Sequence, residues 1–355
     1  MKLEEPDRVP IGELDYDQRL LSNATGIPVE QVFPDEGVGD LRMRKIRNRV
    51  EALSTLIEKL YMDFVPVGEV SPIGWRPRMI DENTWVDEWG AKWRYRDGIK
   101  WYVGGALKGA EDFQSLEFPD PHAPGRMDEA ERLVKRFKGK RALFGGLVGQ
   151  KIPHLARGLD GYTVDLYRSP RLAKRFMEVT TKYNIEIGKL LIDQGVDMIC
   201  MGGDLAGKDG PLMSLNQFRE VFAPAIREPT EAFHKRGVPV IKHSDGNLNP
   251  IMDDLIATGV DAVHSLEPLA GMNIAEIKAK YGDRVCLLGN IDCSHTLTLK
   301  PLRQVEREVK ECINAASPGG GHILSSSNCF HAAVKLENVL AMIRAGRKYG
   351  KYPIT

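Results

Sequence analysis

The sequence predicts an α/β protein folded as a (β/α)₈ TIM barrel, with an N-terminal extension and an aromatic hairpin insertion after the second strand. Three observations lead to this prediction. Short apolar runs recur along the 355 residues, helical patterns separate them, and polar side chains follow where the runs end. Continuous apolar runs are typical of parallel strands that helices cover on both faces. Eight strands that alternate with helices predict a barrel, and the chain length suits one.

The predicted strands are eight apolar runs. In chain order they occupy residues 9–13, 64–69, 142–147, 198–204, 238–245, 262–267, 285–292 and 322–329. The longest helix between them, at 169–194, opens with Ser169-Pro170, which is typical of a helix start. Shorter helices are predicted at 249–258, 274–281, 301–315 and 336–349.

An insertion is predicted at about residues 75–105, within a single barrel domain that spans residues 1–355. All five tryptophans of the chain fall inside it, and residues 87–94 have the pattern of an antiparallel hairpin. Two compatible interpretations are open. The aromatic side chains form a small core that holds the insertion in place, or they form a lid that packs on a flat or apolar substrate.

Composition excludes several classes of protein. The chain has 49 basic and 49 acidic residues, so no bulk field favours nucleic acid or an anionic membrane. The basic run at residues 42–49 predicts a solvated helix face or, alternatively, a handle for an acidic substrate or partner. No apolar run has the length of a membrane span, and the charged first residues lack a signal-peptide core. Five cysteines without regular spacing argue against a disulfide framework, so we expect a cytoplasmic protein.

Polar side chains gather at the carboxyl ends of the predicted strands, where a barrel of this kind carries its reactive groups. These side chains are Glu13, Glu69, Asp204, His243 with Asp245, Glu267, Asn290 with Asp292, and Asn328 with Cys329. The most informative pair is His243 and Asp245. Side chains two residues apart in a strand point to the same side, so these two can reach into one space. An imidazole beside a carboxylate suits a metal site or an acid/base site.

Five segments carry a resemblance to a known family. They are Asp87-Glu88-Trp89-Gly90, Gly210-Pro211-Leu212-Met213-Ser214, Lys242-His243-Ser244-Asp245-Gly246-Asn247, Gly289-Asn290-Ile291-Asp292, and the run from Gly319 to Ser327. In this order and spacing the chain resembles the uroporphyrinogen decarboxylase superfamily, and within it the corrinoid-dependent methyltransferase branch. The resemblance covers nearly the whole chain and implies the same barrel.

The resemblance implies a zinc-assisted methyltransferase. Methyltransferases of this branch bind zinc through His-x-Cys on the fifth strand and a cysteine on the eighth. Here His243 and Cys329 match two of these positions, and Asp245 replaces the middle cysteine, so His243, Asp245 and Cys329 are the predicted metal ligands. Fewer thiolates leave the metal harder, which suits a phenolic or ether oxygen better than a thiol.

The predicted reaction moves a methyl group from a small-molecule donor, an O-methyl aromatic, to the cobalt of a corrinoid (cobalamin) supplied by a partner protein. Asp204 and Glu267 are the predicted catalytic groups, which supply a proton or orient the donor. The predicted substrate contacts are Glu69, Trp89, Asn290 and His331. The resemblance also implies that a homodimer can form.

Alternative interpretations stay open at this point. His331 could replace Cys329 as a ligand or acid, and Asp245 could orient His243 without touching a metal. A metal-free lyase like uroporphyrinogen decarboxylase is the second candidate. True decarboxylases have an arginine-rich first strand that binds substrate carboxylates, whereas this chain carries Glu13 and Asp15 there, which would repel them. The third candidate is a non-catalytic subunit that docks a corrinoid protein.

Overall fold

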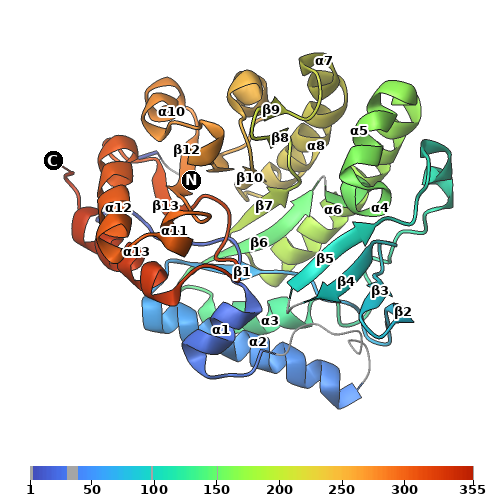
Figure 1. Ribbon diagram of the computed structural model, residues 1–355, viewed down its shortest axis with the longest axis horizontal. Coiled ribbons are helices and arrows are strands. Elements are labelled where there is room, and N and C mark those ends of the chain that lie inside the picture. The colour runs from blue at the N-terminus through green and yellow to red at the C-terminus, as the bar shows by residue number, and fades with distance from the viewer. Residues whose placement is uncertain (1–2, 30–38, 97–98, 150, 355) are drawn as a thin grey trace.

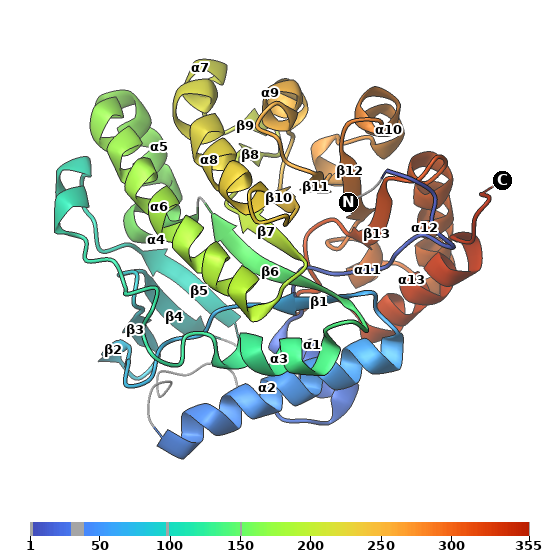
Figure 2. The same ribbon diagram turned by 180° about the vertical axis from the view of Figure 1, so that it is seen from behind.

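The fold is a curled parallel sheet surrounded by helices. The computed structural model describes residues 3–29, 39–96, 99–149 and 151–354. Within these residues, seven parallel strands form one sheet in the order β1-β6-β7-β10-β11-β12-β13. They are β1 (Phe64–Val67), β6 (Ala142–Gly149), β7 (Met198–Gly202), β10 (Val240–Ser244), β11 (Ala262–Ser265), β12 (Cys286–Ile291) and β13 (His322–Ser326). Figures 1 and 2 show the helices arranged outside this sheet, as the predicted barrel-type α/β fold requires.

The segment predicted as the first strand joins the two ends of the sheet. Ile11 forms a parallel bridge with Leu324 of β13. The carbonyl of Ile11 also accepts a 2.9 Å hydrogen bond from the backbone N–H of Asp63, next to β1. The Asp63 carboxylate accepts in turn from the Ile11 N–H at 2.8 Å. The first predicted strand, at residues 9–13, is therefore present as a short bridging segment rather than a regular strand, because the Asp63 side chain accepts a hydrogen bond that a neighbouring backbone carbonyl would otherwise accept.

The helices lie between and around the strands. Those that follow or precede the strands of the sheet are α1 (Gln18–Thr25), α2 (Gly39–Leu60), α3 (Asp128–Phe137), α4 (Lys151–Arg157), α5 (Leu159–Arg168), α6 (Pro170–Gln194), α7 (Leu215–Gln217), α8 (Ala223–His234), α9 (Met252–Ile256), α10 (Ile274–Tyr281), α11 (Thr296–Leu299), α12 (Leu302–Ala316) and α13 (Leu336–Tyr349). The predicted helix at 169–194 matches α6, which has Pro170 at its first turn and ends at Gly195 with φ 108°.

The core has two layers, which decides which strand residues face the site. An inner cluster on the barrel axis includes Cys200, Ile241 and Ala262, and a larger outer cluster fills the space between strands and helices. Because side chains alternate along a strand, the residues two positions after Ile241 and Ala262 also face the axis. These residues are His243 and His264.

The insertion is larger than the predicted hairpin. Among the described residues it forms a four-stranded antiparallel sheet of β2 (Arg78–Asp81), β3 (Thr84–Val86), β4 (Lys92–Arg96) and β5 (Ile99–Gly104). Residues 97 and 98, inside the predicted range, lie outside the described residues. Figure 1 shows this sheet beside α4, and the Tyr102 hydroxyl donates to the carbonyl of Leu155 at 3.0 Å. The antiparallel pattern was thus predicted from sequence, but two of its strands were not.

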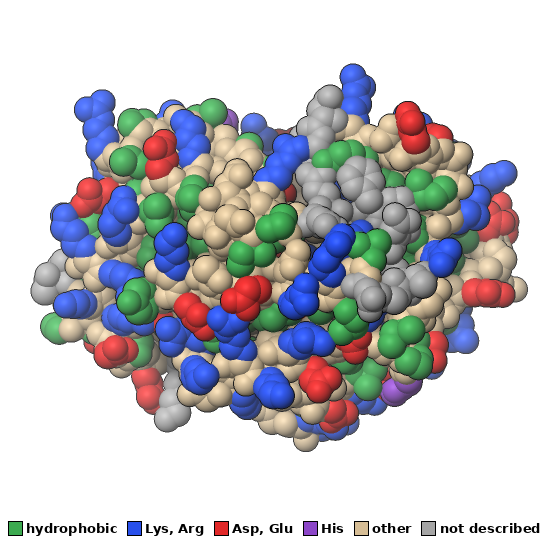
Figure 3. Space-filling model, turned by 90° about the horizontal axis from the view of Figure 1, so that it is seen from below, with side chains coloured by type: hydrophobic (Ala, Val, Ile, Leu, Met, Phe, Trp, Pro, Cys, Tyr) green, Lys and Arg blue, Asp and Glu red, His purple; other side chains and the backbone are tan. Residues whose placement is uncertain are grey.

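The basic run lies on α2 and is partly buried. Arg42 is 5% exposed, and its guanidinium lies 2.5 Å from Asp128 and donates to the carbonyls of Ser71 and Gly125. On the face in Figure 3, basic side chains are interspersed with acidic ones. The predicted solvated face is therefore wrong for Arg42, which joins α2 to the loops before α3. Across the described ranges, no helix is both long and apolar enough to cross a membrane.

Candidate metal and active site

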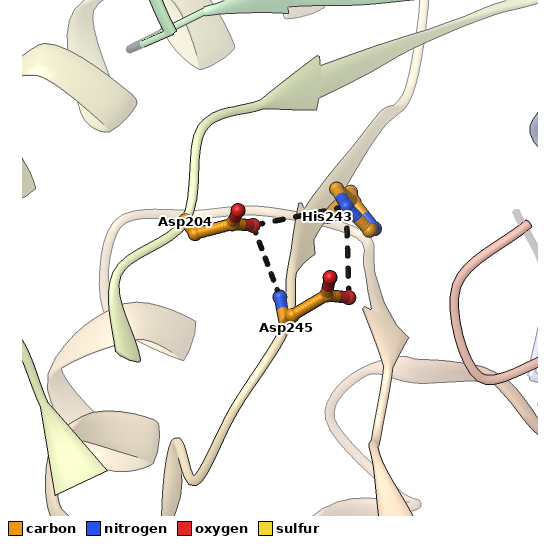
Figure 4. Close-up of side chains that lie close together, drawn as sticks. All are labelled: Asp204, His243 and Asp245. Carbon is orange, nitrogen blue, oxygen red and sulfur yellow. Dashed lines mark hydrogen bonds and ion pairs between the residues drawn. The ribbon is translucent and has the colours of Figure 1, made fainter. Parts of the chain in front are cut away.

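Three side chains that could bind a metal meet at the carboxyl ends of β7 and β10. Asp204 follows β7, His243 lies in β10, and Asp245 follows β10 directly. One ligand atom from each lies within 4.8 Å of the others. Nε2 of His243 lies 3.8 Å from a carboxylate oxygen of Asp204 and 3.8 Å from one of Asp245. Figure 4 shows both carboxylates directed toward the same edge of the imidazole ring.

Local backbone geometry holds Asp245 in this cluster. Its backbone N–H donates to the Asp204 carboxylate at 3.2 Å, which ties the two loops together. Gly246 turns the chain away with φ 84°, and a Cβ there would lie 2.5 Å from the backbone of Ala206. Only glycine combines this φ with this close approach. The turn that the sequence suggested after Asp245 is therefore obligatory.

The Asp245 carboxylate is crowded by other carboxylates. Burial and the nearby charge of Asp204 raise its pKa to about 7. Ser265 donates to one of its oxygens at 3.0 Å, and the side-chain amide of Asn328 donates to the other. A carboxylate pair beside an unprotonated imidazole nitrogen is a suitable donor set for a divalent cation. These three residues therefore fit a metal ion.

His243 is neutral and hydrogen-bonded to a second histidine. Burial and the charge of Lys242 lower the pKa of His243 to about 3. Its Nδ1 lies 2.8 Å from Nδ1 of His264, a residue of β11 with no exposed surface. Burial also lowers the pKa of His264 well below its usual value. His264 was not predicted as a site residue, although its place in the apolar run at 262–267, beside a strand carrying His243, was a usable signal.

Lys242 is a second residue that the sequence analysis missed. It has no exposed surface, and its Nζ donates to the carbonyls of Gly202, Gly203 and His243 at 3.1, 2.7 and 2.7 Å. Burial lowers its pKa to about 8. The three hydrogen bonds use all three ammonium protons. Lys242 therefore joins the end of β7, just before Asp204, to β10.

Cys329 does not join the cluster, although it was predicted as the third ligand. Burial, with the charges of Glu13 and Asp15 nearby, raises the pKa of its thiol, which disfavours the thiolate that binds metals. Its neighbour Asn328 reaches Asp245 instead. The structure thus brings Asp204, predicted as an acid/base group, to the place where a third ligand was expected.

Glu267 and Glu69 lie in different surroundings. Glu267 accepts a 2.9 Å hydrogen bond from the backbone N–H of Gly246, and its charge contributes to the raised pKa of Asp245. It therefore lies at the edge of the cluster. Glu69 lies 3.9 Å from the guanidinium of Arg126, which is 2% exposed and forms a two-point ion pair with Glu88 of the insertion. Arg126 therefore joins Glu69, which follows β1 of the barrel, to Glu88 of the insertion.

The other three predicted substrate contacts, Trp89, Asn290 and His331, each contact other residues of the protein. Trp89 is 8% exposed and packs edge-to-face on Tyr183, with ring centroids 4.7 Å apart, so it supports the insertion rather than presenting a free ring. Asn290 is 7% exposed and donates to the carbonyl of Leu266 at 2.8 Å. His331 donates from Nε2 to the carbonyl of Cys293 at 3.2 Å. The role of these three residues as substrate contacts stays a prediction.

Comparisons with known proteins agree with this architecture. The profile of the uroporphyrinogen decarboxylase (URO-D) family matches residues 84–349. A uroporphyrinogen decarboxylase of Actinobacillus succinogenes is 32% identical over 258 residues, which is 69% of this chain and 70% of the relative. A methylcobamide:CoM methyltransferase, MtaA, of Methanosarcina barkeri is 26% identical over 178 residues, and the matched part is about half of each chain.

The solved structure of a methyltransferase from Methanosarcina mazei has the same fold. It superposes with a TM-score of 0.73 at 18% identity and covers 97% of this chain and 95% of its own. The family match covers most of the chain, and it includes all strands of the parallel sheet except β1. The chain belongs to the uroporphyrinogen decarboxylase family of enzymes and is similar to both its decarboxylases and its methyltransferases.

Proposed function

We propose that this protein is a methyltransferase that moves a methyl group from a methylated donor to the cobalt of a corrinoid carried by a separate protein. The observation that carries the proposal is the group of Asp204, His243 and Asp245 at the carboxyl ends of β7 and β10. It is supported by the similarity to a methylcobamide:CoM methyltransferase. The donor we propose is an O-methyl aromatic, because two carboxylates and one imidazole make a harder site than thiolates do.

The same three residues would hold the metal, with zinc as the first candidate. When bound, zinc supplies a Lewis acid that makes an ether oxygen a better leaving group. This assignment replaces Cys329 by Asp204 as a ligand. Asp204 and Asp245 then supply two negative charges that balance a divalent ion, which removes the repulsion between the two carboxylates.

The reaction balances with one proton. The carbon–oxygen bond of the methyl ether breaks, and its electron pair stays on the aromatic oxygen. A bond forms between the methyl carbon and Co(I), which is oxidised to Co(III). The phenolate takes up a proton, and Glu267, at the edge of the cluster, is the group we assign to deliver it or to orient the donor.

The test is a methyl-transfer assay with a methoxylated aromatic and cob(I)alamin, followed by the absorbance of methylcobalamin and by detection of the phenol. We expect product with the wild-type protein, and a loss of at least about 100-fold in Asp204→Asn, together with loss of bound metal. Asp209→Asn is the matched control, because Asp209 is exposed and lies outside the cluster, on the turn between β8 (Ala206–Gly207) and β9 (Gly210–Pro211). Equal activity in both variants would contradict the proposed site.

A decarboxylating lyase is the second candidate, because the Actinobacillus relative is a uroporphyrinogen decarboxylase. The first segment of the chain disfavours it. Arg8 is paired with Asp63 at 2.6 Å and so is not a free cation for substrate carboxylates, and Glu13 is a buried acid, 1% exposed, where the decarboxylases carry arginine. Release of CO₂ from uroporphyrinogen, with no methyl transfer from any tested donor, would favour the lyase.

A further inference from the structure

We propose that His264 is a positioning residue that fixes the tautomer of His243, so that Nε2 of His243 presents a lone pair to Asp204 and Asp245. The consequence for metal binding rests on the proposed function. The hydrogen-bond geometry does not, and the two can be tested separately.

The two histidines lie side by side on neighbouring strands. His243 of β10 and His264 of β11 are partners in the parallel register, and both face the barrel axis. Their ring centroids lie 5.0 Å apart, with 33° between the ring planes. The 2.8 Å contact joins Nδ1 to Nδ1, so one proton lies between the two nitrogens. The question is which ring carries it.

The hydrogen bond of the other ring nitrogen of His264 shows which ring carries this proton. Its Nε2 lies 3.1 Å from the carbonyl oxygen of Ser326, which can only accept a hydrogen bond, so Nε2 carries a proton. His264 has no exposed surface, and its two ring nitrogens bond Nδ1 of His243 and the carbonyl of Ser326 rather than a carboxylate. A second proton would make it a buried cation without an ion-pair partner, which is costly. Nδ1 of His264 is therefore the acceptor, and Nδ1 of His243 is the donor.

With the proton of His243 on Nδ1, its Nε2 is unprotonated, and this nitrogen faces the two carboxylates. The 3.8 Å distances to Asp204 and Asp245 are too long for hydrogen bonds, so these carboxylates do not supply the orientation themselves. A metal binds an imidazole nitrogen through its lone pair, and the hydrogen bond of the other nitrogen decides which one is free. Without His264 the proton could move to Nε2 and block the site.

The first experiment uses wild-type, metal-free protein labelled with ¹⁵N-histidine. Nitrogen-15 NMR distinguishes a protonated ring nitrogen from an unprotonated one, and the spectrum of His243→Gln assigns the signals. We expect His243 to carry its proton on Nδ1 and His264 on Nε2. A wild-type His243 that carries its proton on Nε2 would overturn the proposal, even if every variant of His264 failed to fold.

The second experiment compares variants by zinc affinity and by the His243 tautomer. We expect His264→Leu to lose the Nδ1–H tautomer and to bind zinc roughly 10- to 100-fold more weakly. His264→Asn can place an amide oxygen near the original acceptor, so we expect it to restore most of both properties. His322→Asn is the matched control, because His322 is also buried in the sheet but bonds Ser317 and Gly289.

The outcomes separate the two proposals. If His264→Leu keeps the tautomer and the zinc affinity, the positioning role is wrong. If wild-type protein shows the expected tautomer but binds no zinc and transfers no methyl group, the proposed function fails while the role of His264 stands.

Discussion

The ammonium group of Lys242 lies 2.7 Å from the carbonyl oxygen of Gly203, the residue before Asp204. A fully buried cation on β10 thus holds the loop that carries one carboxylate of the site. Lys242 therefore links the fold to the position of Asp204. Two further hydrogen bonds join the same loop to β10: the backbone N–H of Asp245 donates to the Asp204 carboxylate, and the backbone N–H of Leu205 donates to the Ser244 hydroxyl.

Lys242→Met should therefore loosen the site as well as the fold. The variant keeps an apolar stem but leaves carbonyl oxygens without their donor, and we expect it to lower the free energy of unfolding by roughly 2–4 kcal/mol. We also expect weaker zinc binding, because Asp204 loses its anchored loop. Chemical denaturation and zinc titration measure the two effects. Lys208→Met, an exposed control on the same loop, should change neither.

Ligand identity can be tested by metal content alone. We expect Asp204→Asn, His243→Ala and Asp245→Asn each to lose most of the zinc bound by wild-type protein after equal exposure to the metal. Cys329→Ser should keep it, because Cys329 lies outside the cluster and burial raises the pKa of its thiol. The measurement is elemental analysis of the purified proteins. Zinc lost from Cys329→Ser and kept in Asp204→Asn would restore the ligand set expected from the family resemblance.

Trp89→Ala should act on stability first. Its ring is buried against Tyr183 and Phe118, so we expect the variant to lose about 3–5 kcal/mol in the free energy of unfolding. Thermal or denaturant unfolding checks this. If the variant unfolds like the wild-type protein but binds the methyl donor more weakly, Trp89 contacts substrate and the packing role is wrong.

Glu13 should make stability depend on pH. It is fully buried at the closure of the sheet, where it accepts hydrogen bonds from Leu14, Ser325 and Ser326, and burial raises its pKa to about 8. The folded protein then holds a proton that the unfolded chain releases near pH 4.5. The stabilisation is complete below pH 4.5 and is lost as the pH rises through 8, by on the order of 5 kcal/mol.

Free energies of unfolding measured from pH 5 to 9 test this decrease of stability with pH. Glu13→Gln cannot release a proton, so its stability should fall less with pH than that of the wild-type protein. Glu117→Gln, which changes an exposed carboxylate, should keep the wild-type slope. The prediction fails if the wild-type and Glu13→Gln curves run parallel over this range.

The order of strands and helices could be predicted from the sequence because each strand is buried on both faces. Such strands read as continuous apolar runs, and the runs at residues 198–204 and 238–245 match β7 and β10 within a few residues. The period of two along a strand also placed His243 and Asp245 on one side before any tertiary contact was known. The glycine after Asp245 predicted the turn that the backbone makes there.

The sequence by itself determined the class of fold, the family and the side of the barrel on which polar groups gather. It did not determine which of those groups meet. Asp204 and Cys329 both end strands, but only Asp204 reaches His243, because Lys242 and the Asp245 N–H hold its loop against β10. His264 and Lys242 lie within apolar runs, so a search for polar side chains at the ends of strands does not single them out. Their roles come from hydrogen bonds between strands, which are fixed by the register of the folded sheet and not by spacing along the chain.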